Sequence, residues 1–261
     1  MYETIQYDVK GKVAHITFNR PKTVNAFNWK MLKESVQAVE TAAHDEEVRC
    51  IVLRGSGKGF SAGADLSIGK DAAAGEADYG HFLRETYNPL LMRMAEVDKP
   101  IVAVLHGPTV GAGLSLALAC DFRIAADNTS LCLAFINIGL VPDAGASFFL
   151  PRIVGYSRAL EMAMLGDTYT AEQAYSLGLV NRVVPMEDLE TVADEFSKRL
   201  ASAPTRALGG IKRNFLKSFE CDLPALLEAE ARQQTVCGRS QDHIEGITAF
   251  FEKRNPHFLG R

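Results

Sequence analysis

Two segments rich in small residues could bring backbone N–H groups close to a ligand. The first, FSAGADL (60–66), follows an apolar run at 50–53 that is typical of a strand. The second, HGPTVGAGLS (106–115), follows the apolar run IVAVL and opens an apolar helical stretch. Small side chains allow a ligand to approach the backbone, and free N–H groups at a helix start favour negative charge. Each segment alone is also consistent with a tight turn or close helix packing. Together, two loops that each offer one N–H predict an oxyanion hole for a thioester oxygen.

One carboxylate, Asp143, lies in an apolar setting. It follows Pro142 in the segment IGLVPDAGAS and is flanked by small and aliphatic residues. Two interpretations are open from the spacing. The side chain could cap a helix that begins near Ala144, or it could act as a general base whose pKa is raised by apolar surroundings.

The composition bounds the class of protein. The 261 residues are 47% hydrophobic and 23% charged, which is ordinary for a globular α/β chain. The net charge of −4 argues against a general nucleic-acid-binding surface. Five cysteines without a C-x-x-C spacing and six histidines without ligand spacing predict neither disulfides nor a metal site. With no long apolar run and no signal-peptide pattern, we expect a soluble, cytoplasmic protein without a membrane partner.

The elements that must position these residues alternate between strands and helices. A right-handed βαβ arrangement around a buried sheet is expected up to about residue 135. Beyond residue 158 the pattern is helical, and Thr170 with Gln173 forms a capping-box signature. We therefore predict an α/β core over 1–190 and a helical C-terminal region over 191–261. The predicted strands are 13–18, 50–53, 101–105, FRIA (122–125) and LCLAF (131–135), and the predicted helices include 31–43, 189–200, 204–217, 223–237 and 240–253.

Several segments in order resemble the enoyl-CoA hydratase/isomerase (crotonase) superfamily over most of the chain. The resemblance implies a spiral core of ββα turns, a C-terminal trimerisation region, and a homotrimer or a hexamer made of two trimers. It also implies an acyl-CoA substrate, with coenzyme A as part of that substrate and no bound prosthetic group. The segments are FSAGADL, KPIVAVLHGPTVGAGLSLALACD, IGLVPDAGASFFLPRIVG, TAEQAYSLGLVNRVV and EGITAFFEKRNPHF.

The resemblance also assigns residues to the site. The oxyanion hole would be the backbone N–H groups of Ala62 and Ala112. Phe250 and Lys253 resemble positions that contact coenzyme A, often from a neighbouring subunit. The coenzyme A nucleotide would lie near Lys22, Val24, Ala26, Ala62, Asp65 and Leu66.

The functional hypothesis rests on residues that differ from the family pattern. Ser115 and Phe135 stand where hydratases of the family carry two glutamates, which makes ordinary hydration doubtful. Together with Tyr87 they are predicted to line the acyl pocket, although Tyr87 and Phe135 could equally be core residues. The position of Asp143 resembles a catalytic aspartate of dienoyl-CoA isomerases, aryl-CoA dehalogenases and the isomerase of phenylacetyl-CoA ring epoxides. The last branch is the one that the segments 87–90 (YNPL), GAGLSLALACD and GLVPDAGASFFLPR resemble most. Dehalogenation is the weaker choice, because Asn88 and Phe135 stand where the dehalogenases carry a His and a Trp.

We therefore predict an acyl-CoA isomerase in which Asp143 moves the proton. Hydratase activity, a dehalogenase-like reaction and non-catalytic acyl-CoA binding remain the alternatives.

Overall fold

A computed structural model describes residues 2–65 and 78–261. Its main sheet, within those residues, has six strands in the order β1-β2-β3-β4-β6-β9. The β1–β2 hairpin is antiparallel and the other neighbours are parallel. The strands are β1 (Ile5–Lys10), β2 (Val13–Phe18), β3 (Cys50–Gly55), β4 (Ile101–Leu105), β6 (Phe122–Ala126) and β9 (Arg182–Val184).

A second, smaller sheet carries the glycine-rich loop at 106–115. Its order is β5-β7-β8, formed by Pro108–Val110, Ser130–Cys132 and Thr168–Thr170. The predicted strand 131–135 is therefore too long, because a 3-10 helix, η3 (Ala134–Ile138), begins two residues after Cys132. The other predicted strands are confirmed, and β1 is an element that we did not predict.

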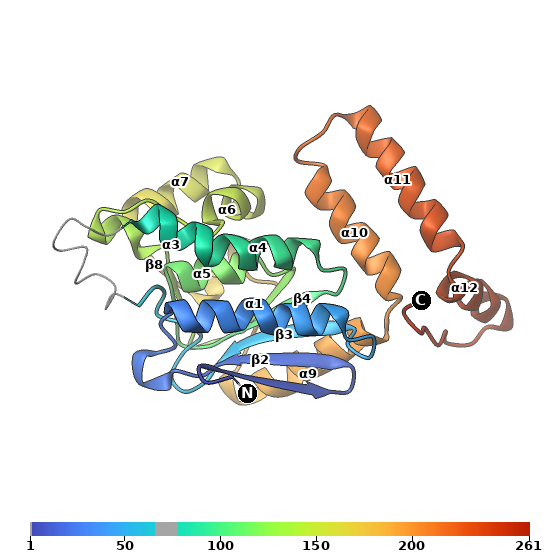
Figure 1. Cartoon of the computed structure of the whole chain (residues 1–261), viewed down its shortest axis with the longest axis horizontal. Coiled ribbons are helices and arrows are strands. Elements are labelled where there is room, and N and C mark those ends of the chain that lie inside the picture. The colour runs from blue at the N-terminus through green and yellow to red at the C-terminus, as the bar shows by residue number, and fades with distance from the viewer. Residues whose placement is uncertain (1, 66–77) are drawn as a thin grey trace.

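The main sheet is buried on both faces, which explains its continuous apolar strands. On one face Val13, Cys50, Val52 and Val102 pack with α9 (Leu189–Ser202). Residues of opposite parity, such as Ile51, pack on the other face. Further helices of the core lie on the side of that second face (Figure 1). They are α1 (Trp29–His44), α3 (Tyr79–Glu85), α4 (Tyr87–Glu96), α5 (Ala112–Leu118), α6 (Ala146–Val154), α7 (Tyr156–Leu165) and α8 (Ala171–Ser176).

The C-terminal helices project from the sheet. Figure 1 shows α10 (Thr205–Lys217), α11 (Leu223–Gly238) and α12 (Gln241–Glu252) extending to one side of the core. Helix α9 packs on β2, β3, β4 and β6, so the projecting helices begin after the predicted boundary at residue 190. The capping box of α8 is confirmed: the Thr170 hydroxyl accepts from the Gln173 amide. No helix in the described part of the chain is long and apolar enough to cross a membrane.

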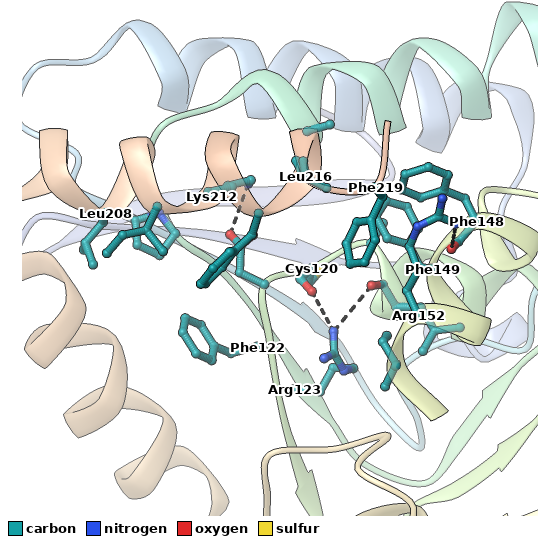
Figure 2. A pocket seen from close by; sticks show the side chains of 18 of the residues that line it. Cys120, Phe122, Arg123, Phe148, Phe149, Arg152, Leu208, Lys212, Leu216 and Phe219 are labelled. Atoms are coloured by element: carbon teal, nitrogen blue, oxygen red, sulfur yellow. Dashed lines mark hydrogen bonds and ion pairs between the residues drawn. The ribbon is translucent and has the colours of Figure 1, made fainter. Parts of the chain in front are cut away.

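A buried arginine ties the start of β6 to the segment before β9. Arg123 is 6% exposed, and its guanidinium donates to the carbonyls of Leu179 at 2.7 Å and Cys120 at 2.6 Å. Figure 2 shows this group below the ring of Phe219 and the chain of Arg152. Because the side chain satisfies buried carbonyls, its loss should leave them without donors.

Replacing Arg123 with Met is expected to lower the free energy of unfolding by about 2–4 kcal/mol, because the buried carbonyls lose their donors. Urea denaturation followed by circular dichroism measures this change. Arg152→Met is the matched control: Arg152 is exposed and stacks on Phe148, so its loss should cost less than about 1 kcal/mol. Equal effects of the two substitutions would contradict the role given to Arg123.

Candidate active site

The two loops of small residues lie side by side. The Ser61 amide donates to the Pro108 carbonyl at 3.1 Å, and the Val110 amide donates to the Ser61 carbonyl at 2.9 Å. A Cβ atom at Gly113 would lie 2.8 Å from the Ser61 Cβ, so only glycine allows this approach. The predicted convergence of the two loops is confirmed.

The candidate donor from the first loop is Ala64, because the N–H of the predicted donor, Ala62, is already bonded within the protein. The Ala62 N–H donates to the Val24 carbonyl at 2.8 Å and is therefore occupied. The Ala64 N–H has no acceptor within residues 2–65 and 78–261, although Gly63 and Asp65 on either side both bond to Phe27. Gly63 has a φ of +91°, which turns the backbone between the two alanines. The free N–H therefore falls two residues after the predicted one.

The candidate donor from the second loop is Ala112, the residue that the family resemblance assigns. Ala112 is the first residue of α5, where an N–H has no partner inside the helix. No acceptor for it is found in the described part of the chain. A Cβ at Gly63 would lie 3.4 Å from the Ala112 nitrogen, so the two loops also meet at this point. Ala64 and Ala112 line one cavity, which gives a candidate oxyanion hole.

A neighbouring loop holds the first donor in place. The Asn25 side chain is fully buried and donates to the carbonyls of Ser56 at 2.8 Å and Gly59 at 2.9 Å. The Ser61 hydroxyl donates to the Asn25 carbonyl at 2.9 Å. Val24 and Asn25 both have left-handed backbone, with φ of 49° and 54°, a conformation that this network must hold. The loop thus fixes both Ala62 and the chain leading to Ala64.

The predicted coenzyme A positions fall into three groups. Lys22 lies in the short 3-10 helix η1 (Pro21–Thr23) and is exposed, and Val24 follows that helix directly. Ala26 is only 8% exposed, and Asp65 forms an ion pair with Arg20 at 2.7 Å, so both have structural contacts. Leu66 lies outside the described residues.

Phe250 and Lys253 lie far from this cavity in the same chain. Phe250 is on α12 and 76% exposed, and Lys253 caps the end of that helix. Figure 1 shows α12 at the opposite end of the molecule from α3 and α5. Contact of these two residues with a ligand in this cavity therefore stays a prediction that requires a second subunit.

The cavity next to Ala64 and Ala112 has a volume of about 250 Å³. Tyr87 and Phe135 line it, as predicted. Ser115 does not: it is fully buried, and its hydroxyl reaches back one helical turn to the Gly111 carbonyl at 3.2 Å. Sequence reasoning missed most of the apolar wall, although two of its aliphatic members, Ile138 and Leu140, lie in the segment of Asp143. The remaining apolar side chains of the wall include Phe82, Leu83, Ile138 and Leu140.

One carboxylate oxygen of Asp143 is bare, that is, buried among these apolar side chains without a described hydrogen-bond partner. Its Oδ1 is buried and has no hydrogen-bond partner in the described chain, and Asp143 lines the cavity. Helix α6 begins at Ala146 without a side-chain cap, so the capping interpretation is wrong. Burial raises the pKa of Asp143 to about 6. The following residue, Ala144, has a φ of +48°, a strained turn that sets the direction of Asp143.

A second, larger cavity of about 490 Å³ lies between α10 and the core, and Figure 2 shows its walls. None of the predicted site residues that the structure describes lines it. Its cations have internal partners: Arg123 bonds to carbonyls, and Lys212 donates to Asp121 at 3.1 Å and to the Met94 carbonyl at 2.8 Å. The cavity at Asp143 is therefore the candidate active site.

Comparison with known proteins agrees with this geometry. Residues 8–261 match the family model described as enoyl-CoA hydratase/isomerase. The chain is 38% identical to the 1,2-epoxyphenylacetyl-CoA isomerase of Escherichia coli, with all of both chains covered. It is 42% identical to a "probable enoyl-CoA hydratase" of Rhodobacter capsulatus, over 100% of this chain and 99% of the relative. The crystal structure of the enoyl-CoA hydratase of Bacillus anthracis superposes with a TM-score of 0.92 at 31% identity, over 99% of this chain and all of the other. The fold and the site thus define a crotonase-type protein. The chain belongs to the enoyl-CoA hydratase/isomerase family.

Proposed function

We propose that the chain is an acyl-CoA isomerase that uses Asp143 as its acid/base. The observation that carries this proposal is a single bare carboxylate in an apolar cavity beside two free amides. The other described acid on the wall, Asp65, is paired with Arg20. The similarity of the chain to a relative that is named as an isomerase supports the same proposal.

The proposed reaction moves one proton. The Asp143 carboxylate removes a proton from a carbon of the acyl group, and the electron pair of that C–H bond moves into the thioester. The thioester oxygen becomes an enolate oxygen, which accepts hydrogen bonds from the Ala64 and Ala112 amides. The protonated Asp143 then returns the proton to a different carbon, and the double bond has shifted. Opening of a ring epoxide on an arylacetyl group would use the same carboxylate and the same two amides.

Coenzyme A enters this proposal only as part of the substrate, and no prosthetic group is needed for the step. We further propose that the active form is a homotrimer or a hexamer in the cytoplasm. Phe250 and Lys253 would then contact coenzyme A bound to a neighbouring subunit, because α12 lies away from the cavity of its own chain.

Hydration is the second candidate, because a relative carries a hydratase name. Addition of water uses a base for the water and an acid for the α-carbon, and Asp143 would have to serve both. Loss of the conjugated absorbance of crotonyl-CoA measures this activity. A dehalogenase-like reaction has less support, since Asn88 is exposed and absent from the cavity wall.

Proton exchange tests the isomerase proposal directly. The protein is incubated in D₂O with enoyl-CoA and arylacetyl-CoA thioesters, and NMR follows deuterium incorporation and double-bond migration. We expect both in the wild type and neither in Asp143→Asn. Binding without exchange on every thioester would reject the proposal in favour of non-catalytic binding.

The activity should depend on the pH with a midpoint near the pKa of Asp143, which is about 6. Only the carboxylate form accepts a proton, so kcat/KM should rise through that pH and level off above it. Below the midpoint the rate should fall about tenfold for each pH unit. A profile measured from pH 4.5 to 8 checks this, and a midpoint near 4 would show that burial does not control the carboxylate.

A further inference from the structure

The cavity holds a second polar group without a partner. The hydroxyl of Tyr87 is buried and makes no hydrogen bond with any described residue, and Tyr87 is 1% exposed. Five described residues have a buried side-chain nitrogen or oxygen atom without a hydrogen-bond partner. Of these five, only Tyr87 and Asp143 line the cavity. An unpaired buried hydroxyl costs roughly 1–3 kcal/mol in the free protein. A bound ligand that carries an acceptor can supply the partner that this hydroxyl lacks among the described residues.

The ring of Tyr87 is held so that its hydroxyl cannot find a partner elsewhere. Tyr87 begins α4, and its ring meets Phe27 edge-to-face at 6.1 Å and Phe82 at 5.9 Å. Aromatic pairs in this arrangement restrict the ring as well as stabilise it. The residue before it, Thr86, is fully buried and donates its hydroxyl to the Phe82 carbonyl at 2.5 Å.

The phenol is a neutral donor at every pH at which the site works. Burial, and then the charge of Asp143, hold the pKa of Tyr87 well above its usual value. Tyr87 and Asp143 line the same cavity. They are not bonded to each other, because each lacks a partner.

We propose that the Tyr87 hydroxyl donates a hydrogen bond to an oxygen atom carried by the acyl group, beside the carbon on which Asp143 acts. The thioester oxygen is not this acceptor, because Ala64 and Ala112 supply its donors. The rest of the wall, including Phe82, is largely apolar. The site therefore selects acyl groups that are mostly hydrocarbon and carry one oxygen, such as a ring epoxide or hydroxyl, over plain hydrocarbon chains. This inference deepens the proposed function and rests on it.

Binding of two ligands that have no double bond or epoxide to isomerise in the acyl chain tests the inference without requiring turnover. Isothermal titration compares phenylacetyl-CoA with 2-hydroxyphenylacetyl-CoA, which adds one oxygen. Wild type is expected to bind the hydroxylated ligand about tenfold more tightly, which corresponds to one satisfied hydrogen bond. Tyr87→Phe removes the hydroxyl and keeps the ring, and it should abolish this preference.

Two control variants show which side chain contacts the added oxygen of the ligand. Tyr7→Phe removes another buried, unpaired hydroxyl that lies outside the cavity, and it should keep the preference. Asp143→Asn should also keep it, even though that variant loses turnover. A preference lost in Asp143→Asn and kept in Tyr87→Phe would overturn the assignment, as would equal binding of both ligands by wild type.

The stability of Tyr87→Phe provides an independent readout. Because the hydroxyl has no partner in the free chain, its removal should leave the urea midpoint at or above that of wild type. A lower midpoint would mean that the hydroxyl is bonded within the protein, which would overturn the inference. If Asp143→Asn keeps turnover while Tyr87→Phe loses the binding preference, the proposed function fails and the oxygen contact stands.

Discussion

Replacing Asp143 with asparagine is expected to lower turnover by roughly 10²–10⁴-fold, because the amide cannot accept the substrate proton. The same change should make the chain more stable at neutral pH. The side chain keeps its size, and the buried charge is removed. Activity and stability should therefore move in opposite directions. Turnover of an acyl-CoA panel and urea unfolding at pH 7 measure the two effects.

The pH dependence gives the stability effect its sign. The pKa of Asp143 rises from its ordinary value of 3.8, which applies to the unfolded chain, to about 6 in the folded chain. Between these two pH values the folded chain therefore binds more protons than the unfolded chain. Stability contributed by this group is present below pH 4 and is lost as the pH rises to 6. The full difference corresponds to at most about 3 kcal/mol. Asp143→Asn should therefore gain up to this amount at pH 7 and nothing at pH 3.5.

Asp65→Asn is the matched control for this experiment. Asp65 lines the same cavity and is paired with Arg20 at 2.7 Å. Its replacement removes a partner of a cation, so stability should fall rather than rise. A gain in both variants, or a loss in both, would show that the buried charge of Asp143 is not the cause.

Replacing Gly113 with alanine is expected to lower turnover by about 10²-fold while the chain stays folded. The new methyl group would lie 2.8 Å from both the Cβ and the carbonyl oxygen of Ser61. These atoms belong to the neighbouring loop, so the two loops must separate. Ala112 and Ala64 would then no longer meet the same oxygen, and loss of one such donor costs 10²–10³-fold in other enzymes.

Gly238→Ala controls for the helical change itself. Gly238 ends α11, and a Cβ there has no atom within 4 Å. Alanine should be neutral or slightly stabilising at this position. Steady-state kinetics and thermal unfolding of both variants check the comparison. Full turnover by a folded Gly113→Ala protein would show that the spacing of the loops does not set the rate.

Much of the fold could be predicted from local patterns. The strand at 13–18 is confirmed residue for residue, because its polar flanks mark both ends. The helices at 189–202 and 205–217 lie within two residues of prediction, since their apolar spacing is regular. The strand at 131–135 failed because apolar residues alone do not distinguish a strand from a 3-10 turn.

The chemistry of the site could be predicted from the sequence, and its geometry could be predicted less well. Asp143 stood out because a carboxylate among apolar residues is unusual. The choice between Ala62 and Ala64 depends on the positive φ of Gly63, which composition does not reveal. Ser115 failed for a similar reason: its hydroxyl bonds inside its own helix. The unpaired hydroxyl of Tyr87 follows only from packing around its ring.

The left-handed turn at Ala144 has a consequence for protein engineering. A residue with a φ of +48° is an obvious target for stabilisation, and glycine would relieve its strain. Ala144 directly follows Asp143, so a change in this turn is expected to move the proposed catalytic carboxylate and to trade catalytic precision for robustness. Directed evolution toward heat tolerance should therefore find substitutions that leave activity unchanged on the exposed surface of α9, away from this turn and from the proposed coenzyme A contacts of α12.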